Sequence, residues 1–398
     1  MSGQGTYRLD DPLDVSGADF LRACEALTGA PISYGNELDL LINGDEIFPA
    51  MLETIGAAQH TLCLLSYVYW SGEIAREVAG AIADRARAGV DVCVLLDAVG
   101  SLRMPRDVME IMSGSGARVQ RFRPVASRAL RRANNRNHRK LLIADGHVGM
   151  TGGVGIAQEW TGDAQDPEHW RDTHVRVRGP VVRGLHGAFA ESWLEATGQM
   201  LCGPDHLPQL DGLDGGGPMQ LVRSRASVGD TNAEALLYLA IASARSTIDL
   251  TSAYFAPREE FSEALCEAAR RGVRVRVLVP GEHADKQIVR RAGQDTYAPL
   301  LDCGIAIHEY APTMLHAKTL VIDGAWTTIG SINFDNRSFS RNDEATLCVQ
   351  SREVAALLSE QFERDLERSD RVHPGEWRRR GPLARAAEIA TRVVRREL

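Results

Sequence analysis

The sequence predicts an α/β fold of two similar halves, with mixed sheets flanked by helices, a pseudo-twofold relation and one active site between the halves. Two observations support this prediction. Three segments recur in the same order, and the second copies begin 186, 183 and 178 residues after the first. Each half also alternates helical patterns with short apolar runs, which is typical of a sheet covered by helices on both faces.

The repeated segments have matching residue patterns as well as matching spacing. They are IGAAQHTLCLLSYVY from Ile55 with IASARSTIDLTSAYF from Ile241, AIADRARAGVDVCVLL from Ala81 with ALCEAARRGVRVRVLV from Ala264, and HRKLLIADGHVGMTGGVGI from His138 with HAKTLVIDGAWTTIGSINF from His316. In the first half, a helical stretch over residues 74–88 stops at Gly89 and is followed by VDVCVLLD. Such a continuous apolar run indicates a strand buried on both faces, so we expect a largely parallel sheet.

With 398 residues, the chain is long enough for two domains. The stretch containing GLDGGGP has the composition of a linker. We therefore expect an N-terminal appendage over residues 1–35, a first repeat over 36–201, a linker over 202–218, a second repeat over 219–370 and a basic, amphipathic tail over 371–398.

Composition restricts the partners and the location. The formal net charge is −8, which argues against nucleic acid as the main partner. The polar, acidic N-terminus does not resemble a signal peptide, and no apolar run approaches the roughly 20 residues that span a bilayer. The seven cysteines are scattered without a CxxC pair, so we expect them to be reduced. These features predict a cytoplasmic protein whose membrane contact, on the inner face of the cell membrane, is peripheral.

The chemistry is predicted at a pair of residues that occurs twice. His138 and Lys140 precede the apolar run LLIAD, and His316 and Lys318 occupy the same place before TLVID. Residues two apart on a strand share one face. A single pair of this kind is usually an ordinary surface feature. Two copies in matched surroundings indicate a site.

Phosphodiester exchange needs these residue types. One imidazole can attack phosphorus, and the other can protonate the leaving oxygen and later activate the incoming alcohol or water. The two lysines and an amide, Asn333 in the turn IGSIN, can stabilise the charged phosphate oxygens. No metal or other cofactor is required, because the cations belong to the chain.

Acidic residues complete the set of candidates. A nucleophilic imidazole needs an acceptor on its other ring nitrogen, and each half offers one, Asp172 in HWRDTHV and Glu344 in NDEATL. Asp145 and Asp323 end the strands that follow the lysines, where a structural role is favoured over direct chemistry.

These motifs carry a family resemblance. HxKxxxxD followed by a Gly-Gly or Gly-Ser turn, present twice, resembles the phospholipase D superfamily. NHRKLLIADG, WRDTHVRVRGPVV, MLHAKTLVIDG and GSINFDNRSF resemble its bacterial cardiolipin synthase branch over roughly residues 34–398. The tyrosyl-DNA phosphodiesterase branch lacks the aspartate after the lysine. The resemblance implies phosphatidyl transfer on glycerophospholipids through a phosphohistidine. Its implied roles are His138 as nucleophile, His316 as general acid, Lys140, Lys318 and Asn333 as phosphate ligands, and Asp172 and Glu344 as orienting acids.

The first turn departs from the family pattern. The family has asparagine where this chain has Gly155, so one phosphate donor is missing from the first half. Two alternatives therefore stay open. One is hydrolysis, of phospholipid or of a nucleic-acid phosphodiester. The other is a membrane-associated relative without catalysis.

Two basic segments are candidates for contact with anionic lipid. Seven arginines precede the first motif, at positions 118, 121, 123, 128, 131, 132 and 136. They are equally consistent with a positive rim around the site and with a solvated loop. The tail from Arg371 contains eight arginines and three glutamates, and residues 383–398 fit an amphipathic helix that lies on a membrane or docks on the protein.

Overall fold

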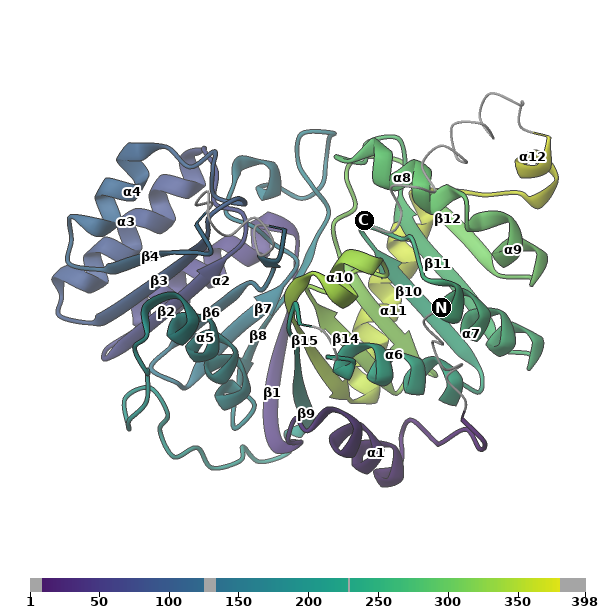
Figure 1. Cartoon of the computed structure of the whole chain (residues 1–398), viewed down its shortest axis with the longest axis horizontal. Coiled ribbons are helices and arrows are strands. Elements are labelled where there is room, and N and C mark those ends of the chain that lie inside the picture. The colour runs from purple at the N-terminus through teal and green to yellow at the C-terminus, as the bar shows by residue number, and fades with distance from the viewer. Residues whose placement is uncertain (1–8, 125–133, 228–229, 380–398) are drawn as a thin grey trace.

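The computed structural model describes residues 9–124, 134–227 and 230–379. Two lobes lie side by side, and each is a twisted sheet with helices on both faces (Figure 1). The predicted α/β class with two related halves is confirmed.

The first lobe contains seven strands of the main sheet, in the order β1-β8-β7-β6-β2-β3-β4. The strands are β1 (Ser33–Ile42), β2 (Thr61–Ser66), β3 (Asp91–Asp97), β4 (Arg118–Phe122), β6 (Leu141–Ala144), β7 (Val148–Gly152) and β8 (Thr173–Arg178). One face is covered by α2 (Asn43–Ala57), α3 (Glu73–Arg87) and α4 (Arg106–Ser113), and the other by α5 (Val182–Thr197). The alternation of side chains along β2 and β3 sends neighbouring residues to opposite faces, so both faces are apolar.

The second lobe repeats this plan in the order β9-β15-β14-β13-β10-β11-β12-β16. The strands are β9 (Gly217–Ser224), β10 (Thr247–Ser252), β11 (Arg274–Pro280), β12 (Ala306–Tyr310), β13 (Lys318–Ile322), β14 (Trp326–Gly330), β15 (Asn342–Gln350) and β16 (Ser369–Arg371). The helices are α6 (Asn232–Ser243), α7 (Glu259–Arg270), α8 (Gln287–Gln294), α9 (Tyr297–Asp302), α10 (Asn336–Ser340), α11 (Arg352–Glu367) and α12 (Pro374–Arg378).

The two halves form one continuous sheet. Strand β1 pairs with β8 on one side and β9 on the other, and the short β5 (Arg136–Asn137) of the first half pairs with β15 of the second. Antiparallel pairs predominate, so the expectation of a largely parallel sheet is wrong. Among the described strands of the main sheet, only β2-β3-β4 and β10-β11-β12 form parallel sets. The strand after each His-Lys segment turns back through a tight hairpin, which makes the next pair antiparallel.

Helix α1 (Ala18–Thr28) precedes the first repeat in sequence but packs against the second lobe (Figure 1). It contacts α6, and Phe20 meets Trp326 edge to face with ring centroids 5.5 Å apart. None of the helices within the described ranges has the length and apolar character needed to span a bilayer.

The expectation that all cysteines are reduced is wrong for one pair. Cys266 on α7 and Cys303 after α9 form a disulfide, because the packing of these helices brings their Cα atoms to 5.4 Å. The other five cysteines are free thiols.

Three of the clustered arginines are committed to carboxylates. Arg118 pairs with Asp91, Arg123 pairs with Glu195, and buried Arg136 lies 3.5 Å from Asp97. Arg123 also lies 3.3 Å from Asp343 of the second lobe. These three arginines are therefore committed to ion pairs within the protein. Arg128, Arg131 and Arg132, like residues 383–398 of the tail, lie outside the described residues.

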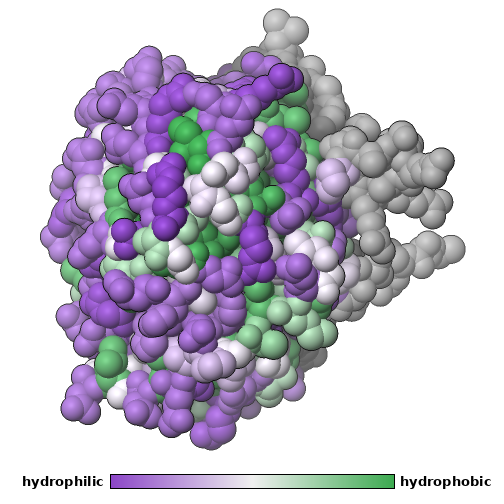
Figure 2. All heavy atoms as spheres, turned by 90° about the vertical axis from the view of Figure 1, so that its left-hand side faces the viewer, coloured by the Kyte–Doolittle hydropathy of each residue, from purple (hydrophilic) through white to green (hydrophobic). Residues whose placement is uncertain are grey.

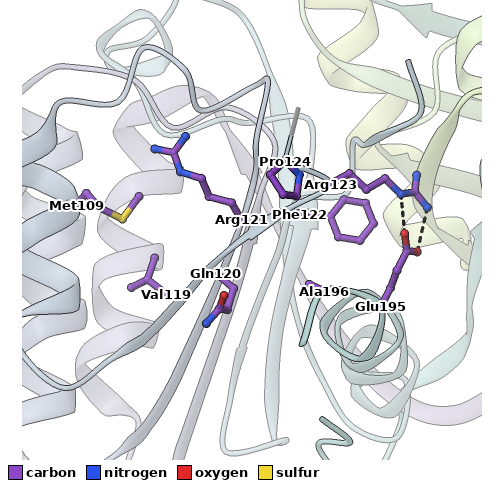
Figure 3. Close-up of a pocket in the computed structure, with 9 residues that line it drawn as sticks. All are labelled: Met109, Val119, Gln120, Arg121, Phe122, Arg123, Pro124, Glu195 and Ala196. Atoms are coloured by element: carbon purple, nitrogen blue, oxygen red, sulfur yellow. Dashed lines mark hydrogen bonds and ion pairs between the residues drawn. The ribbon is translucent and has the colours of Figure 1, made fainter. Parts of the chain in front are cut away.

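A cavity of about 540 Å³ lies at the edge strand β4, between α4 and α5 (Figure 3). The Arg123–Glu195 pair borders it, and Met109, Val119 and Phe122 supply apolar lining. None of the His-Lys residues lines it. Figure 2 shows this end of the first lobe as a mostly hydrophilic face with small apolar areas.

Candidate active site

The two His-Lys pairs lie where the lobes meet. His138 and Lys140 directly precede β6, and His316 directly precedes β13, which begins at Lys318. All four residues are at most 7% exposed. The β-type alternation at each strand entry places histidine and lysine on the same side, as the sequence predicts.

The acidic partners cross between the halves. His316 Nδ1 lies 2.7 Å from Asp172, and His138 Nδ1 lies 3.0 Å from Glu344. A carboxylate only accepts, so in the neutral imidazoles Nδ1 carries the hydrogen and Nε2 the lone pair. His316 Nδ1 also lies 3.0 Å from Lys318 Nζ, but its contact with Asp172 is the shorter one. Each acid therefore faces the histidine of the other half, a pairing that the sequence leaves open.

Main-chain bonds explain the crossing. The backbone N–H of His138 donates to the carbonyl of Asp343, and that of His316 donates to the carbonyl of Arg171, at 2.9 and 2.7 Å. Each of these carbonyls belongs to the residue just before the acid of the other half. The backbone therefore delivers each histidine to the opposite repeat, and the site is complete only when both halves are in place.

Further contacts hold the two acids in position. Trp160 Nε1 donates to Asp172 at 2.9 Å, and Asn342 Nδ2 donates to Glu344 at 3.1 Å. Buried Arg139 donates to the Glu344 carbonyl at 3.1 Å. Sequence reasoning did not select these residues, although Arg139 and Asn342 directly adjoin selected segments.

Aromatic rings enclose the imidazoles. Tyr67 lies edge-on to His138 with centroids 5.0 Å apart, and Trp160, Trp170 and Tyr254 surround His316 at 5.2 to 6.2 Å. These rings limit access of water to the imidazoles and lower the local dielectric constant.

Burial changes the protonation of the site. It lowers the pKa of His138 to about 4 and that of His316 to about 3, and it lowers the pKa of Lys140 to about 7 and that of Lys318 to about 8. Both imidazoles are therefore neutral near pH 7 in the free site. A neutral imidazole with its Nδ1–H bonded to a carboxylate is a competent nucleophile at Nε2.

These shifts predict acid sensitivity. Between the folded and unfolded pKa values, the unfolded chain binds more protons than the folded one. Stability therefore falls as pH drops from 6.5 towards 4 for His138 and towards 3 for His316. We expect each imidazole to contribute a loss on the order of 1–3 kcal/mol. Thermal unfolding followed against pH should show a shallower slope in His316→Asn, whereas the same change at exposed His147 serves as the control. An unchanged slope in His316→Asn would contradict the assignment.

The turn that holds Asn333 in the second half and the turn that holds Gly155 in the first half differ in their packing. In the second half, Asn333 is buried and its Oδ1 accepts from the backbone N–H of Tyr254 at 3.3 Å. Gly155 and Val68 occupy the equivalent positions in the first half. A Cβ at Gly155 would lie 2.7 Å from the Cβ of Val68 and 3.1 Å from Trp160. Glycine is therefore required by close packing of the chain at this point.

We expect Gly155→Asn to destabilise the fold rather than to restore a phosphate donor. Overpacking at such a contact costs about 1–3 kcal/mol. Gly80→Ala is the matched control, because its Cβ in α3 would meet nothing within 4 Å. Chemical denaturation of both variants measures the difference. A stable Gly155→Asn variant with a raised transfer rate would overturn the packing explanation.

Asp145 and Asp323 act on the backbone. Asp145 accepts from the N–H groups of residues 59, 60 and 61, and Asp323 accepts from those of residues 245, 246 and 247. Both carboxylates therefore anchor the starts of β2 and β10, the first strand of each parallel set. They make no described contact with the imidazoles.

The fold and the paired His-Lys segments define a phospholipase D-like protein. A family model described as "Cardiolipin synthase, PLD-like domain" matches residues 237–366. Cardiolipin synthases of Halalkalibacterium halodurans and Geobacillus kaustophilus are 32% and 33% identical to this chain; each alignment covers 94% of this chain, with 74% and 75% of the respective relative. The chain belongs to the cardiolipin synthase family of phospholipase D-like proteins.

Solved structures support the fold. The phosphatidylserine synthase of Haemophilus influenzae superposes with a TM-score of 0.70 at 12% identity, covering 95% of this chain and all of that one. The polyphosphate kinase of Porphyromonas gingivalis reaches 0.59 at 12% identity, covering 98% of this chain and 56% of that one.

Proposed function

We propose that this protein joins two phosphatidylglycerol molecules to give cardiolipin and glycerol. The observation that carries the proposal is the site itself, in which two imidazoles, each oriented through Nδ1 by a carboxylate, lie beside two buried lysines. The cardiolipin synthases to which the chain is similar support the choice of substrate.

In the first step, His138 Nε2 attacks phosphorus and the bond to the glycerol oxygen breaks. Protonated His316 gives its proton to that oxygen, and glycerol leaves. In the free site His316 is neutral, and the negative charge of the bound phosphodiester favours its protonation. Lys140, Lys318 and the Asn333 amide stabilise the charge on the phosphate oxygens.

In the second step, neutral His316 takes the proton from a hydroxyl of the second phosphatidylglycerol. That oxygen attacks phosphorus, the bond to His138 breaks, and cardiolipin forms. Burial keeps water away from the phosphohistidine and thereby favours transfer over hydrolysis.

The test is product analysis with phosphatidylglycerol vesicles and a metal chelator. Cardiolipin and glycerol in equal amounts are expected. Phosphatidic acid alone would indicate a hydrolase, and cleavage of plasmid DNA under the same conditions would favour the nucleic-acid alternative. Vesicle binding without turnover of any phosphodiester would identify a non-catalytic relative.

Exposed apolar residues beside the site are suited to membrane contact. Leu102 and Ile288 are 67% and 59% exposed. Next to them, Arg103 lies over the Trp70 ring and Lys286 over the Tyr254 ring, at 4.8 and 4.7 Å. Tyr254 contacts His316, and Trp70 reaches it through Trp160. The turn at Leu102 and the start of α8 therefore flank the site, where apolar side chains can insert among lipids while cations meet anionic headgroups.

We expect Leu102→Glu combined with Ile288→Glu to weaken binding to phosphatidylglycerol vesicles about tenfold or more, because buried apolar surface is lost. Activity on a short-chain, monomeric phosphatidylglycerol should be retained. Leu213→Glu is the control, since the backbone N–H of Leu213 donates to Gly35 near the start of β1, whereas the Asp172 end of β8 pairs with the other end of β1. Vesicle sedimentation measures binding. Equal binding by the double variant and the control would refute the contact.

A further inference from the structure

A second cluster of chemically active side chains lies in the first lobe, away from the His-Lys pairs. Cys63 on β2, His186 on α5 and His206 in the segment between the repeats are all buried. One ligand atom from each lies within 4.8 Å of the others. Strand β6 pairs antiparallel with β2, with Leu141 opposite Leu65, so the His138 segment adjoins the other end of β2.

Each imidazole has an oxygen atom near its Nε2. His186 Nε2 lies 3.2 Å from the carbonyl of Leu201, and His206 Nε2 lies 3.6 Å from the carboxylate of Asp91. In metal sites the ring nitrogen that does not bind metal faces a carbonyl or carboxylate in this way. The two Nδ1 atoms remain for coordination.

One of these atoms has no partner in the described structure. His206 Nδ1 is buried, and no hydrogen bond reaches it. His206 is 8% exposed. Leaving a buried polar atom unsatisfied costs about 1–3 kcal/mol, so a ligand at this position would remove a real penalty.

The second lobe shows that this position is a polar one. Cys63 and its strand neighbour Cys93 correspond to Asp249 and Arg276 in the repeat. Arg276 donates twice to Asp249, at 2.7 and 2.8 Å. In the second lobe, the space between the sheet and α11 is therefore filled at this position by an ion pair. The first lobe instead has two thiols facing α5, His186 on α5 itself and His206 nearby, and thiols and imidazoles are the ligands that zinc prefers.

We propose that Cys63, His186 and His206 bind one zinc ion, with the thiol of Cys93, the neighbour of Cys63 on β3, as a candidate fourth ligand. Zinc takes such ligands at about 2.0 to 2.3 Å, so the cluster must contract slightly around the ion. The metal replaces the thiol proton of Cys63, which is released to solvent. Binding fastens the segment between the repeats to the first lobe, and the site is independent of the proposed transfer reaction.

The test uses the purified full-length protein. We expect one zinc per chain by elemental analysis, a thiolate-to-metal absorption band when cobalt(II) replaces zinc, and a lower unfolding temperature after chelation. Cys63→Ser and His206→Gln should each lower metal affinity about tenfold or more, because a direct ligand is lost. Circular dichroism verifies that the variants are folded.

Two matched controls separate coordination from general damage. Cys348→Ser changes a buried cysteine of the second lobe, and His147→Gln changes an exposed histidine of the first lobe. Both should keep full metal binding. A wild-type protein that takes up neither zinc nor cobalt overturns the proposal, as does a folded His206→Gln variant with unchanged affinity. Phosphatidyl transfer by folded His206→Gln should persist, which distinguishes this site from the catalytic one.

Discussion

Replacing His138 with asparagine is expected to lower the rate of phosphatidyl transfer by a factor on the order of 10⁴ to 10⁶, because the group that forms the covalent intermediate is lost. Asparagine keeps a polar side chain of similar reach beside Glu344, so folding should be retained. Cardiolipin formation from phosphatidylglycerol measures the rate, and His147→Asn is the exposed control. Mass spectrometry of quenched wild-type protein should place a phosphatidyl adduct on His138. An adduct on His316 instead would reverse the assigned roles.

The second large effect on the transfer rate is expected from Asp172 and Glu344, each of which binds the histidine of the other half. Asp172→Asn should slow transfer from phosphatidylglycerol about 10²- to 10⁴-fold, because His316 loses the partner that fixes its tautomer. A substrate with a nitrophenolate leaving group needs no proton, so adduct formation from it should be nearly normal in Asp172→Asn. Glu344→Gln should slow adduct formation from both substrates, because Glu344 orients the nucleophile His138.

Single-turnover release of nitrophenolate provides the measurement. His316→Ala should behave like Asp172→Asn, and His138→Asn should behave like Glu344→Gln. Each acid variant should therefore match the variant of the histidine in the other half, and this result does not depend on which imidazole attacks. If Asp172→Asn groups with His138→Asn, each half orients its own histidine in solution and the observed pairing is not the functional one.

Several features could be predicted from sequence because they depend on local patterns. The repeated segments predict two related α/β halves, and the position of each His-Lys pair at a strand entry predicts a shared face. The continuous apolar runs favour a parallel sheet, but the turns after the lysines close antiparallel hairpins. The Cys266–Cys303 bond depends on helix packing that no local pattern specifies.

The sequence by itself was enough to choose the candidate site residues, since phosphodiester chemistry needs histidine, lysine and acid at repeated spacings. Their pairing was decided by tertiary structure. Asp172 follows His138, and Glu344 follows His316, at similar distances along the chain. This spacing does not tell whether each acid binds the histidine of its own half or that of the other half. The backbone bonds from His138 to Asp343 and from His316 to Arg171 decide it. Burial at the junction of the lobes then lowers the histidine pKa values, because only the assembled interface excludes water.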